Sequence, residues 1–165
     1  MRYQMKQKLW AMGNDFTIKD AQGQDVFFVD GKAFAIGDKL SFQDMQGNEL
    51  AYIAQKMLSL KKRYEIYRQG ALFAEVVKEW TFFKDKYTVD IPGPNDYEVQ
   101  GNFWDHEYAF VRQGREVAHV SKQYFTFRDT YGIDIIDGED DIAILATAVV
   151  IDLVNQHNRG NAAGH

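Results

Sequence analysis

Cysteine is absent from this sequence, proline occurs only twice, and serine occurs three times among 165 residues. The absence of cysteine excludes disulfide bonds, thiolate metal ligands and cysteine nucleophiles. The N-terminal segment MRYQMKQKLWAMGND is basic but lacks the apolar core of a signal peptide, and no apolar run reaches the ~20 residues of a membrane-spanning helix. We therefore expect a protein with no transmembrane segment, either free in the cytoplasm or peripheral to the membrane.

Motifs of the common enzyme classes are also missing. None of the three serines lies in the G-x-S-x-G pattern of a nucleophile, and no Walker or dinucleotide-binding glycine motif occurs. Carboxylate pairs such as Asp105/Glu107 and Asp134/Asp137 arise by chance in a chain with 24 acidic residues. The sequence therefore predicts a non-enzymatic protein with no catalytic residue and no cofactor.

The four histidines form no H-x-x-x-H or H-E-x-x-H pair, so we predict no metal site. In Asp105-His106-Glu107, neighbouring side chains on a strand point to opposite faces. We interpret this triplet as a solvated loop tip rather than a cluster of metal ligands. His119 lies between alanine and valine, and we interpret it as a side chain of the barrel wall.

The composition predicts an ordered, globular protein. Aromatic residues make up 15% of the chain and charged residues 26%, and the length suffices for one full hydrophobic core. We expect a single domain over residues 1–165, ordered from about residue 3 to residue 157, with 158–165 as a tail. The net charge of −5 argues against nucleic acid as a partner.

The longest apolar segment covers residues 139–154 and reads EDDIAILATAVVIDLV. An amphipathic surface helix has one apolar stripe, whereas this segment is apolar on every side, so a helix here must be buried all round. Asp137 is the predicted N-cap, and Asp140 three residues later resembles a capping box. The predicted end of the helix lies within residues 155–160, NQHNRG.

Short aromatic and β-branched segments fill the rest of the chain, separated by glycine, asparagine and aspartate, and they predict strands joined by turns. The predicted strands are 16–19, 26–29, 40–42, 50–53, 64–67, 72–77, 87–91, 97–99, 108–111, 117–120 and 131–136.

Two of these hairpins occur twice. FTIKDAQGQDVFFV (16–29) aligns with LSFQDMQGNELAYI (40–53), and both have Asp-x-Gln-Gly at the turn. YEIYRQGALFAEVVK (64–78) aligns with YAFVRQGREVAHVSK (108–122), and both have Arg-Gln-Gly at the turn. Since the match extends beyond the glycines that such turns need, we interpret it as a repeated hairpin unit rather than convergent turn chemistry.

Ten to twelve short strands before one all-apolar helix predict the architecture. Many strands with regular turns are typical of a sandwich or a barrel, and a barrel of sufficient size can enclose another element. Small residues at Ala143, Ala146 and Ala148 would let strand aromatics approach the helix closely. We therefore predict a mainly β protein, a closed antiparallel barrel of about 12 strands around a central apolar C-terminal helix.

This organisation resembles the LURP-one-related family, which belongs with the Tubby C-terminal domain and the phospholipid scramblases. The resemblance covers residues 3–155 and is closest to the bacterial type, whose members are largely of unknown activity. It rests on D-x-x-G turns at 20–23 and 44–47, Ile/Val-x-Lys returns at 76–78 and 120–122, and Y-x-I-x-I at 131–135 before the apolar helix. It implies a twelve-stranded barrel wrapped around that helix.

The resemblance also implies contact with lipids. Tubby domains bind phosphoinositide headgroups through a basic surface groove, but this chain does not match their binding motif residue by residue, so no binding residue is carried over. The absence of cysteine removes the acylation sites expected of a scramblase, and the short helix with Asp152 disfavours membrane insertion.

Lys61, Lys62 and Arg63 form the densest basic cluster. Basic residues near an anionic lipid surface contribute ~1 kcal/mol each, so this triplet is the predicted anion-binding site. The alternative, which a single triplet favours, is protection of a sheet edge against aggregation. The aromatic runs 80–83 (WTFF) and 103–104 (FW) predict core packing for most members, with a bilayer interface or ligand stacking as the alternative.

The leading hypothesis is a non-enzymatic binding or scaffold domain of unknown cellular role that recognises an anionic ligand, such as a phospholipid headgroup, on its outer surface. One alternative is a carrier of a small apolar molecule of the lipocalin type, which requires an empty barrel. Another is a hydrolase with a dispersed site, which requires a pocket of convergent polar groups. The sequence does not identify a protein partner.

Overall fold

The computed structural model describes residues 1–6, 15–31, 37–82, 84–126 and 129–163, and this part of the chain contains twelve strands and two helices. The elements are β1 Arg2–Lys6, β2 Asp15–Asp20, β3 Asp25–Gly31, β4 Lys39–Asp44, β5 Glu49–Gln55, β6 Arg63–Arg68, β7 Ala71–Glu79, β8 Lys86–Asp90, β9 Tyr97–Asn102, β10 Glu107–Arg112, β11 Arg115–Ser121, the 3-10 helix η1 Lys122–Tyr124, β12 Thr130–Ile135 and α1 Asp141–Ala163.

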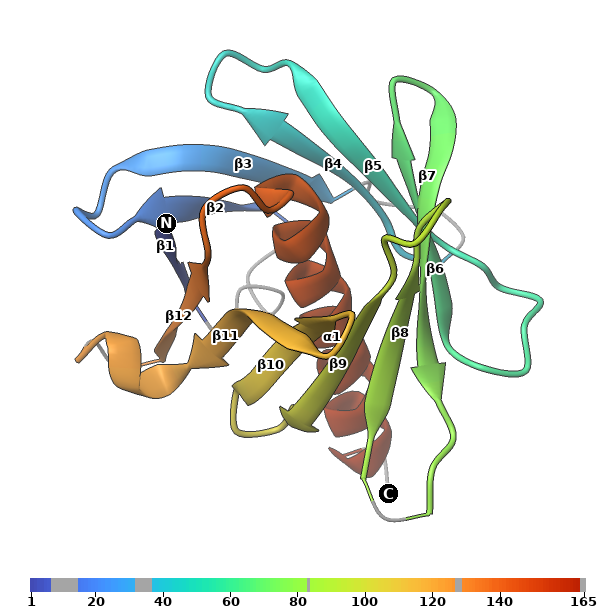
Figure 1. Ribbon diagram of the computed structural model, residues 1–165. Coiled ribbons are helices and arrows are strands. Elements are labelled where there is room, and N and C mark those ends of the chain that lie inside the picture. The colour runs from blue at the N-terminus through green and yellow to red at the C-terminus, as the bar shows by residue number, and fades with distance from the viewer. Residues whose placement is uncertain (7–14, 32–36, 83, 127–128, 164–165) are drawn as a thin grey trace.

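The strands form a closed antiparallel barrel (Figure 1). Each strand pairs with its neighbours in sequence, and β1 pairs with β12 to close the ring. The predicted fold is therefore confirmed. Strand β1 was not predicted, although Tyr3 and Met5 alternate as buried residues in the pattern of a half-buried strand.

Helix α1 runs through the barrel, as predicted (Figure 1). Residues 143–155 are all buried, and the inward-facing strand residues pack around them in one core. The single hydroxyl in this stretch is satisfied, because Thr147 Oγ1 donates to the carbonyl of Ala143 at 2.8 Å. The barrel interior is filled by the helix, and this rules out an apolar-molecule carrier with an empty lumen.

Both predicted ends of the helix need correction. The N-cap is Asp140 rather than Asp137, because Asp140 Oδ1 accepts from the backbone N–H of Ala143 and the Asp140 carbonyl accepts from Ile144. At the other end α1 continues to Ala163. Asn155 contacts the carbonyl of Phe103 and His157 contacts Asp38, and these contacts stabilise the helix past the residues where the sequence predicts its end.

The repeated hairpins are structural equivalents. Asp20 Oδ1 accepts from the backbone N–H of residues 22 and 24, and Asp44 Oδ1 accepts from those of residues 46 and 48. In the second pair, Gln69 and Gln113 both have φ of 51°. All four hairpins carry a register shift at the matching place, next to Ile18, Phe42, Ile66 and Phe110. The alignment therefore reflects one hairpin geometry used repeatedly.

The alternating strand direction gives the barrel two different ends. We call the end where α1 begins the helix-entry end; it carries the tight hairpin turns. We call the opposite end the loop end; it carries the β5–β6 connection (56–62), the β7–β8 connection (80–85) and the β9–β10 connection (103–106). Within the described residues, no helix is long and apolar enough to span a membrane.

Candidate functional site

The predicted basic triplet lies at the loop end, where the chain enters β6, but two of its members are neutralised. Lys61 Nζ lies 2.6 Å from Glu79 Oε2, and Arg63 Nη1 lies 2.6 Å from Glu75 Oε2. The hydrogen bond from Lys61 holds the pKa of Glu79 below its ordinary value. Lys62 is exposed and forms no ion pair with any residue that the structure describes.

Protection of a sheet edge does not explain the triplet. Strand β6 pairs with β5 on one side and β7 on the other, and a closed barrel has no edge strand. The Lys61–Glu79 and Arg63–Glu75 pairs instead fasten the base of the β5–β6 connection to β7. A backbone bond from Lys78 N–H to the Lys62 carbonyl, 2.9 Å long, adds to this attachment.

The loop end is locally basic in an acidic chain. The β5–β6 and β7–β8 connections contain four lysines and one aspartate, whereas the whole protein has a net charge of −5. Three of these lysines are exposed and form no ion pair with described residues, and we call them the rim lysines: Lys56, Lys62 and Lys84. The connections at the helix-entry end contain neither lysine nor arginine.

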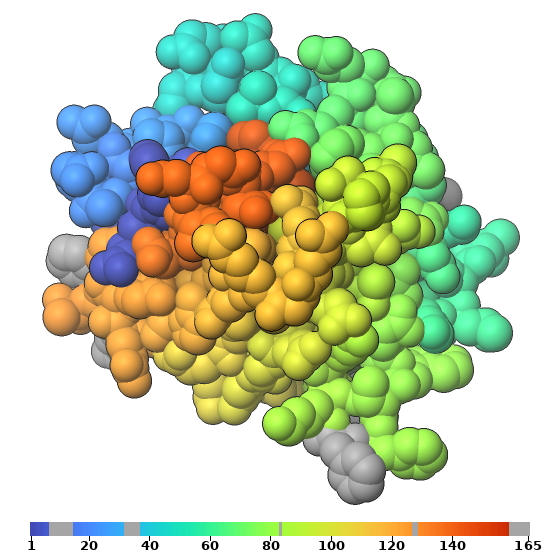
Figure 2. Space-filling view, viewed as in Figure 1, coloured from blue at the N-terminus to red at the C-terminus, as the bar shows by residue number. Residues whose placement is uncertain are grey.

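Large apolar side chains project from the same two connections. Leu58 is 98% exposed, Leu60 92%, Trp80 71% and Phe82 100%, and we call these four residues the apolar tips. Their exposure contradicts the prediction that the WTFF run packs in the core, whereas Phe103, at 3%, does pack there. Phe83 lies outside the described residues. In Figure 2 the two connections project separately, at the right (turquoise) and at the bottom (lime green).

A hollow of about 490 Å³ lies beside the β7–β8 connection. Its lining surface is mostly apolar, with Phe82 as the one aromatic residue, and it includes the side chains of two lysines and one aspartate. The lining residues are Thr81, Phe82, Lys84, Asp85, Lys86 and Gln100. Lys86 Nζ already pairs with Glu98 Oε1 at 3.2 Å, so Lys84 is the cation of this hollow that remains available.

His106 does not form the solvated loop tip that the sequence predicted. It is 3% exposed, because the β9–β10 connection turns its side chain into the barrel, and its Nε2 lies 3.0 Å from Asp152 Oδ1 on α1. The Tyr131 hydroxyl donates to the other oxygen of Asp152, and its ring stacks on the imidazole with centroids 4.3 Å apart. Burial raises the pKa of Tyr131 well above its ordinary value, so this hydroxyl stays a donor.

This buried cluster attaches the loop end to the helix rather than presenting a reactive group to solvent. Asn155 Nδ2 donates to the Phe103 carbonyl at 2.9 Å in the same region. His157 Nε2 lies 2.7 Å from Asp38 Oδ2, which also accepts from Tyr64. No local pattern predicts these contacts, since their members are far apart in the chain.

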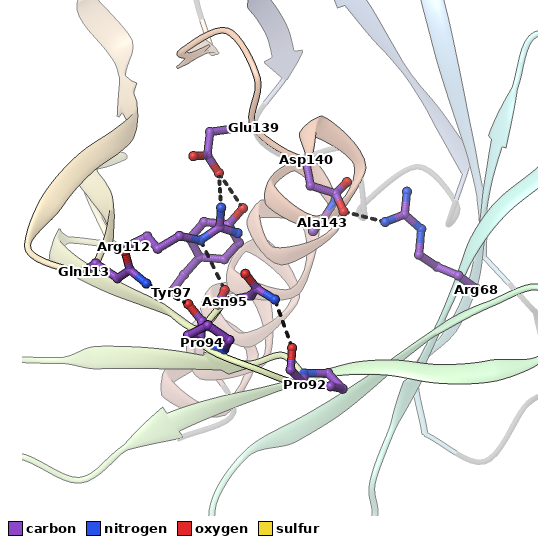
Figure 3. Close-up of polar contacts among 10 residues, drawn as sticks. All are labelled: Arg68, Pro92, Pro94, Asn95, Tyr97, Arg112, Gln113, Glu139, Asp140 and Ala143. Atoms are coloured by element: carbon purple, nitrogen blue, oxygen red, sulfur yellow. Dashed lines mark hydrogen bonds and ion pairs between the residues drawn. The ribbon is translucent and has the colours of Figure 1, made fainter.

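Two arginines at the helix-entry end, Arg68 and Arg112, pair with carboxylates next to the start of α1 (Figure 3). Arg112 Nη1 lies 2.8 Å from Glu139 Oε2, which also accepts from the Tyr97 hydroxyl, and Arg68 Nη1 lies 2.5 Å from Asp140 Oδ2. Both arginines are the last strand residues before the repeated Gln-Gly turns, so one hairpin geometry supplies a cation on each side of the helix start. These arginines are occupied by carboxylates and are not available to an anionic ligand.

His119 lies on the barrel wall as predicted, with Nδ1 2.7 Å from Glu116 Oε1. Asp105 stays exposed and accepts from Asn102. Among the described residues no three His, Asp or Glu side chains come together as metal ligands.

Comparison with known proteins places this barrel in a family. The sequence profile of the LURP-one-related family matches residues 1–152. The uncharacterized protein YxjI of Bacillus subtilis strain 168 is 36% identical over 150 residues, which are 91% of each chain. The X-ray structure of a protein from Arabidopsis thaliana superposes with a TM-score of 0.68 at 19% identity, over 93% of this chain and 91% of that chain.

The plant structure shows a common fold, the Tubby-like barrel with a single helix, and neither relative identifies a ligand. The family profile spans nearly the whole chain, and the Bacillus relative is 36% identical over 91% of it. The chain therefore belongs to the LURP-one-related family.

Proposed function

We propose that this protein is a non-enzymatic binding module whose loop end recognises an anionic ligand, a phospholipid headgroup. In this proposal residues 1–165 act as one domain in the cytoplasm, free or bound peripherally to a membrane. The observation that carries it is the charge contrast between the two ends. Arg68 and Arg112, the two arginines beside the helix start, are held by carboxylates, whereas the rim lysines at the loop end are exposed and form no ion pair with described residues.

The proposal revises the role of each member of the basic triplet. Lys62 is the member that contacts the ligand, while Lys61 and Arg63 hold the connection in place through Glu79 and Glu75. Lys84 supplies a second cation beside the hollow of about 490 Å³. Each lysine contributes ~1 kcal/mol near an anionic lipid surface, and salt screens this attraction.

Vesicle flotation tests the proposal. The full chain is mixed with vesicles of phosphatidylcholine alone, or of phosphatidylcholine with phosphatidylserine, at low and high salt. We expect flotation with the anionic vesicles at low salt and its loss at high salt. Equal recovery with both compositions would overturn the proposal.

Charge-reversal variants locate the site. The triple variant Lys56→Glu/Lys62→Glu/Lys84→Glu should abolish flotation, because it removes all three rim lysines. Lys19→Glu serves as the control, since Lys19 lies near the helix-entry end and is held by Asp25 at 2.5 Å. A single variant, Lys62→Glu, changes the net charge by the same amount as the control and should weaken flotation, whereas Lys19→Glu should not. Equal loss of binding in these two single variants would show that net charge, and not the loop end, governs binding.

A further inference from the structure

We propose that the partner of the loop end is the surface of an anionic lipid bilayer, with the apolar tips inserted among the lipids and the rim lysines at the headgroups. This inference rests on the proposed function and names the source of its ligand. It assigns a role to the apolar tips, which have no charge and which headgroup recognition alone does not require.

The first observation is the degree of exposure. Leu58, Leu60 and Phe82 are each more than 90% exposed, whereas most large apolar side chains of this chain lie in the barrel core. The apolar tips form two separate groups, Leu58 with Leu60 and Trp80 with Phe82, and exposed apolar groups gathered at one end of a protein mark a contact with another molecule or with a membrane. Burial of these side chains is favourable, so the loop end has a driving force for docking.

The second observation is the order of residues in the β5–β6 connection, which reads KMLSLKK. Lysine stands on both sides of the two leucines. Lysine can extend along an apolar surface while its ammonium group stays in water, which suits the boundary between acyl chains and headgroups. Trp80 in the adjacent connection is the residue type enriched at membrane–water interfaces.

The third observation concerns shape and charge. The two connections project as separate convex knobs in Figure 2, so a protein partner would need two hollows at matching spacing, whereas a fluid bilayer adapts to both. A second copy of this chain is disfavoured for another reason. In a symmetric dimer the same patch meets itself, and the rim lysines would then face one another.

The fourth observation is the firm base of the connections. Lys61–Glu79 and Arg63–Glu75 join β6 and β7 just below the tips. On β7 itself, Lys78 lies 4.0 Å from Asp85 at the end of the β7–β8 connection. The apolar tips are therefore presented outward from paired strands.

Fluorescence quenching by lipids brominated on the acyl chains tests the inference with the full chain. We expect brominated phosphatidylcholine/phosphatidylserine vesicles to quench tryptophan emission of the wild type, and Trp80→Phe to lose most of that quenching. Leu58→Ser/Leu60→Ser should weaken vesicle binding about tenfold or more. Leu72→Ser is the matched control, because Leu72 is 51% exposed at the helix-entry end; its affinity should equal that of the wild type.

Each contrary outcome separates the two proposals. Binding to anionic vesicles without quenching, and without an effect of Leu58→Ser/Leu60→Ser, overturns insertion and leaves headgroup recognition standing. If the protein binds free glycerophosphoserine as tightly as it binds vesicles, insertion is likewise overturned and headgroup recognition stands. A dimer in sedimentation analysis that Leu58→Ser/Leu60→Ser dissociates overturns the bilayer as partner. Failure to bind anionic vesicles at all overturns both proposals.

Discussion

His106 Nε2 lies 3.0 Å from Asp152 Oδ1, so a residue of the loop end contacts the central helix inside the barrel. Both side chains are less than 10% exposed, and Asp152 also accepts from the buried Tyr131 hydroxyl. Asp152, a charged residue in an otherwise apolar part of the helix, is thus the point at which α1 and the β9–β10 connection are joined.

Asp152→Ala should lower the free energy of unfolding by about 3 kcal/mol or more, because it leaves the His106 and Tyr131 groups buried without their acceptor. Urea unfolding followed by circular dichroism measures this. His119→Gln is the control, since His119 is half-exposed on the barrel wall and its loss should cost less than about 0.5 kcal/mol. An Asp152→Ala protein of near wild-type stability would show that the buried contact does not hold the loop end.

Arg112→Gln should destabilise the protein by about 1–2 kcal/mol, and Arg68→Gln by about 0.5–1 kcal/mol. The two residues are equivalent in the repeated turns, but the Arg112–Glu139 pair is more buried and shares its carboxylate with Tyr97. Denaturation midpoints of the two variants give the comparison. The reverse order of effects would contradict the assigned roles.

The chain should unfold cooperatively above about pH 10, the ordinary pKa of tyrosine. Burial raises the pKa of eight tyrosines, and the rise is largest in Tyr3, Tyr64, Tyr87, Tyr97, Tyr108 and Tyr131. The unfolded chain then loses protons that the folded chain retains, so stability is full below pH 10 and falls as pH rises above it. Tyrosinate absorbance should appear together with the loss of circular dichroism; gradual ionisation of all nine tyrosines in a folded protein would refute this.

Ala146→Asp should abolish folding, because Ala146 is fully buried at the barrel centre and the new charge would have no partner there. Ala71→Asp, on the exposed start of β7, should fold normally. Soluble expression and circular dichroism of both variants measure whether each one folds. A soluble Ala146→Asp protein that unfolds cooperatively would be incompatible with a central helix.

The sequence predicted the barrel because its signals were local. The all-apolar segment containing Ala143, Ala146 and Ala148 had to be buried on every side, and the repeated Asp-x-Gln-Gly and Arg-Gln-Gly turns marked the hairpins. The N-cap was misplaced because Asp137 and Asp140 both have the required chemistry, and only the fold decides which of them accepts from Ala143.

The site was harder to predict because it depends on which charges are paired. Lys61, Lys62 and Arg63 form one basic run in the sequence. Strand pairing, however, brings glutamates of β7 to Lys61 and Arg63 and leaves Lys62 without such a partner among the described residues. Hydrophobicity alone likewise predicted burial for the WTFF run, although Trp80 and Phe82 extend beyond the ends of the strands. His106 was misplaced because its partner lies 46 residues away.

The most direct test of the account is hydrogen exchange of the full chain, with and without phosphatidylcholine/phosphatidylserine vesicles. We expect vesicles to slow exchange in residues 56–62 and 80–85, with no change in the hairpin turns at the helix-entry end or in α1. Protection that centres on the helix-entry end, or that is spread evenly over the barrel wall, would contradict the claim that this protein binds through its loop end.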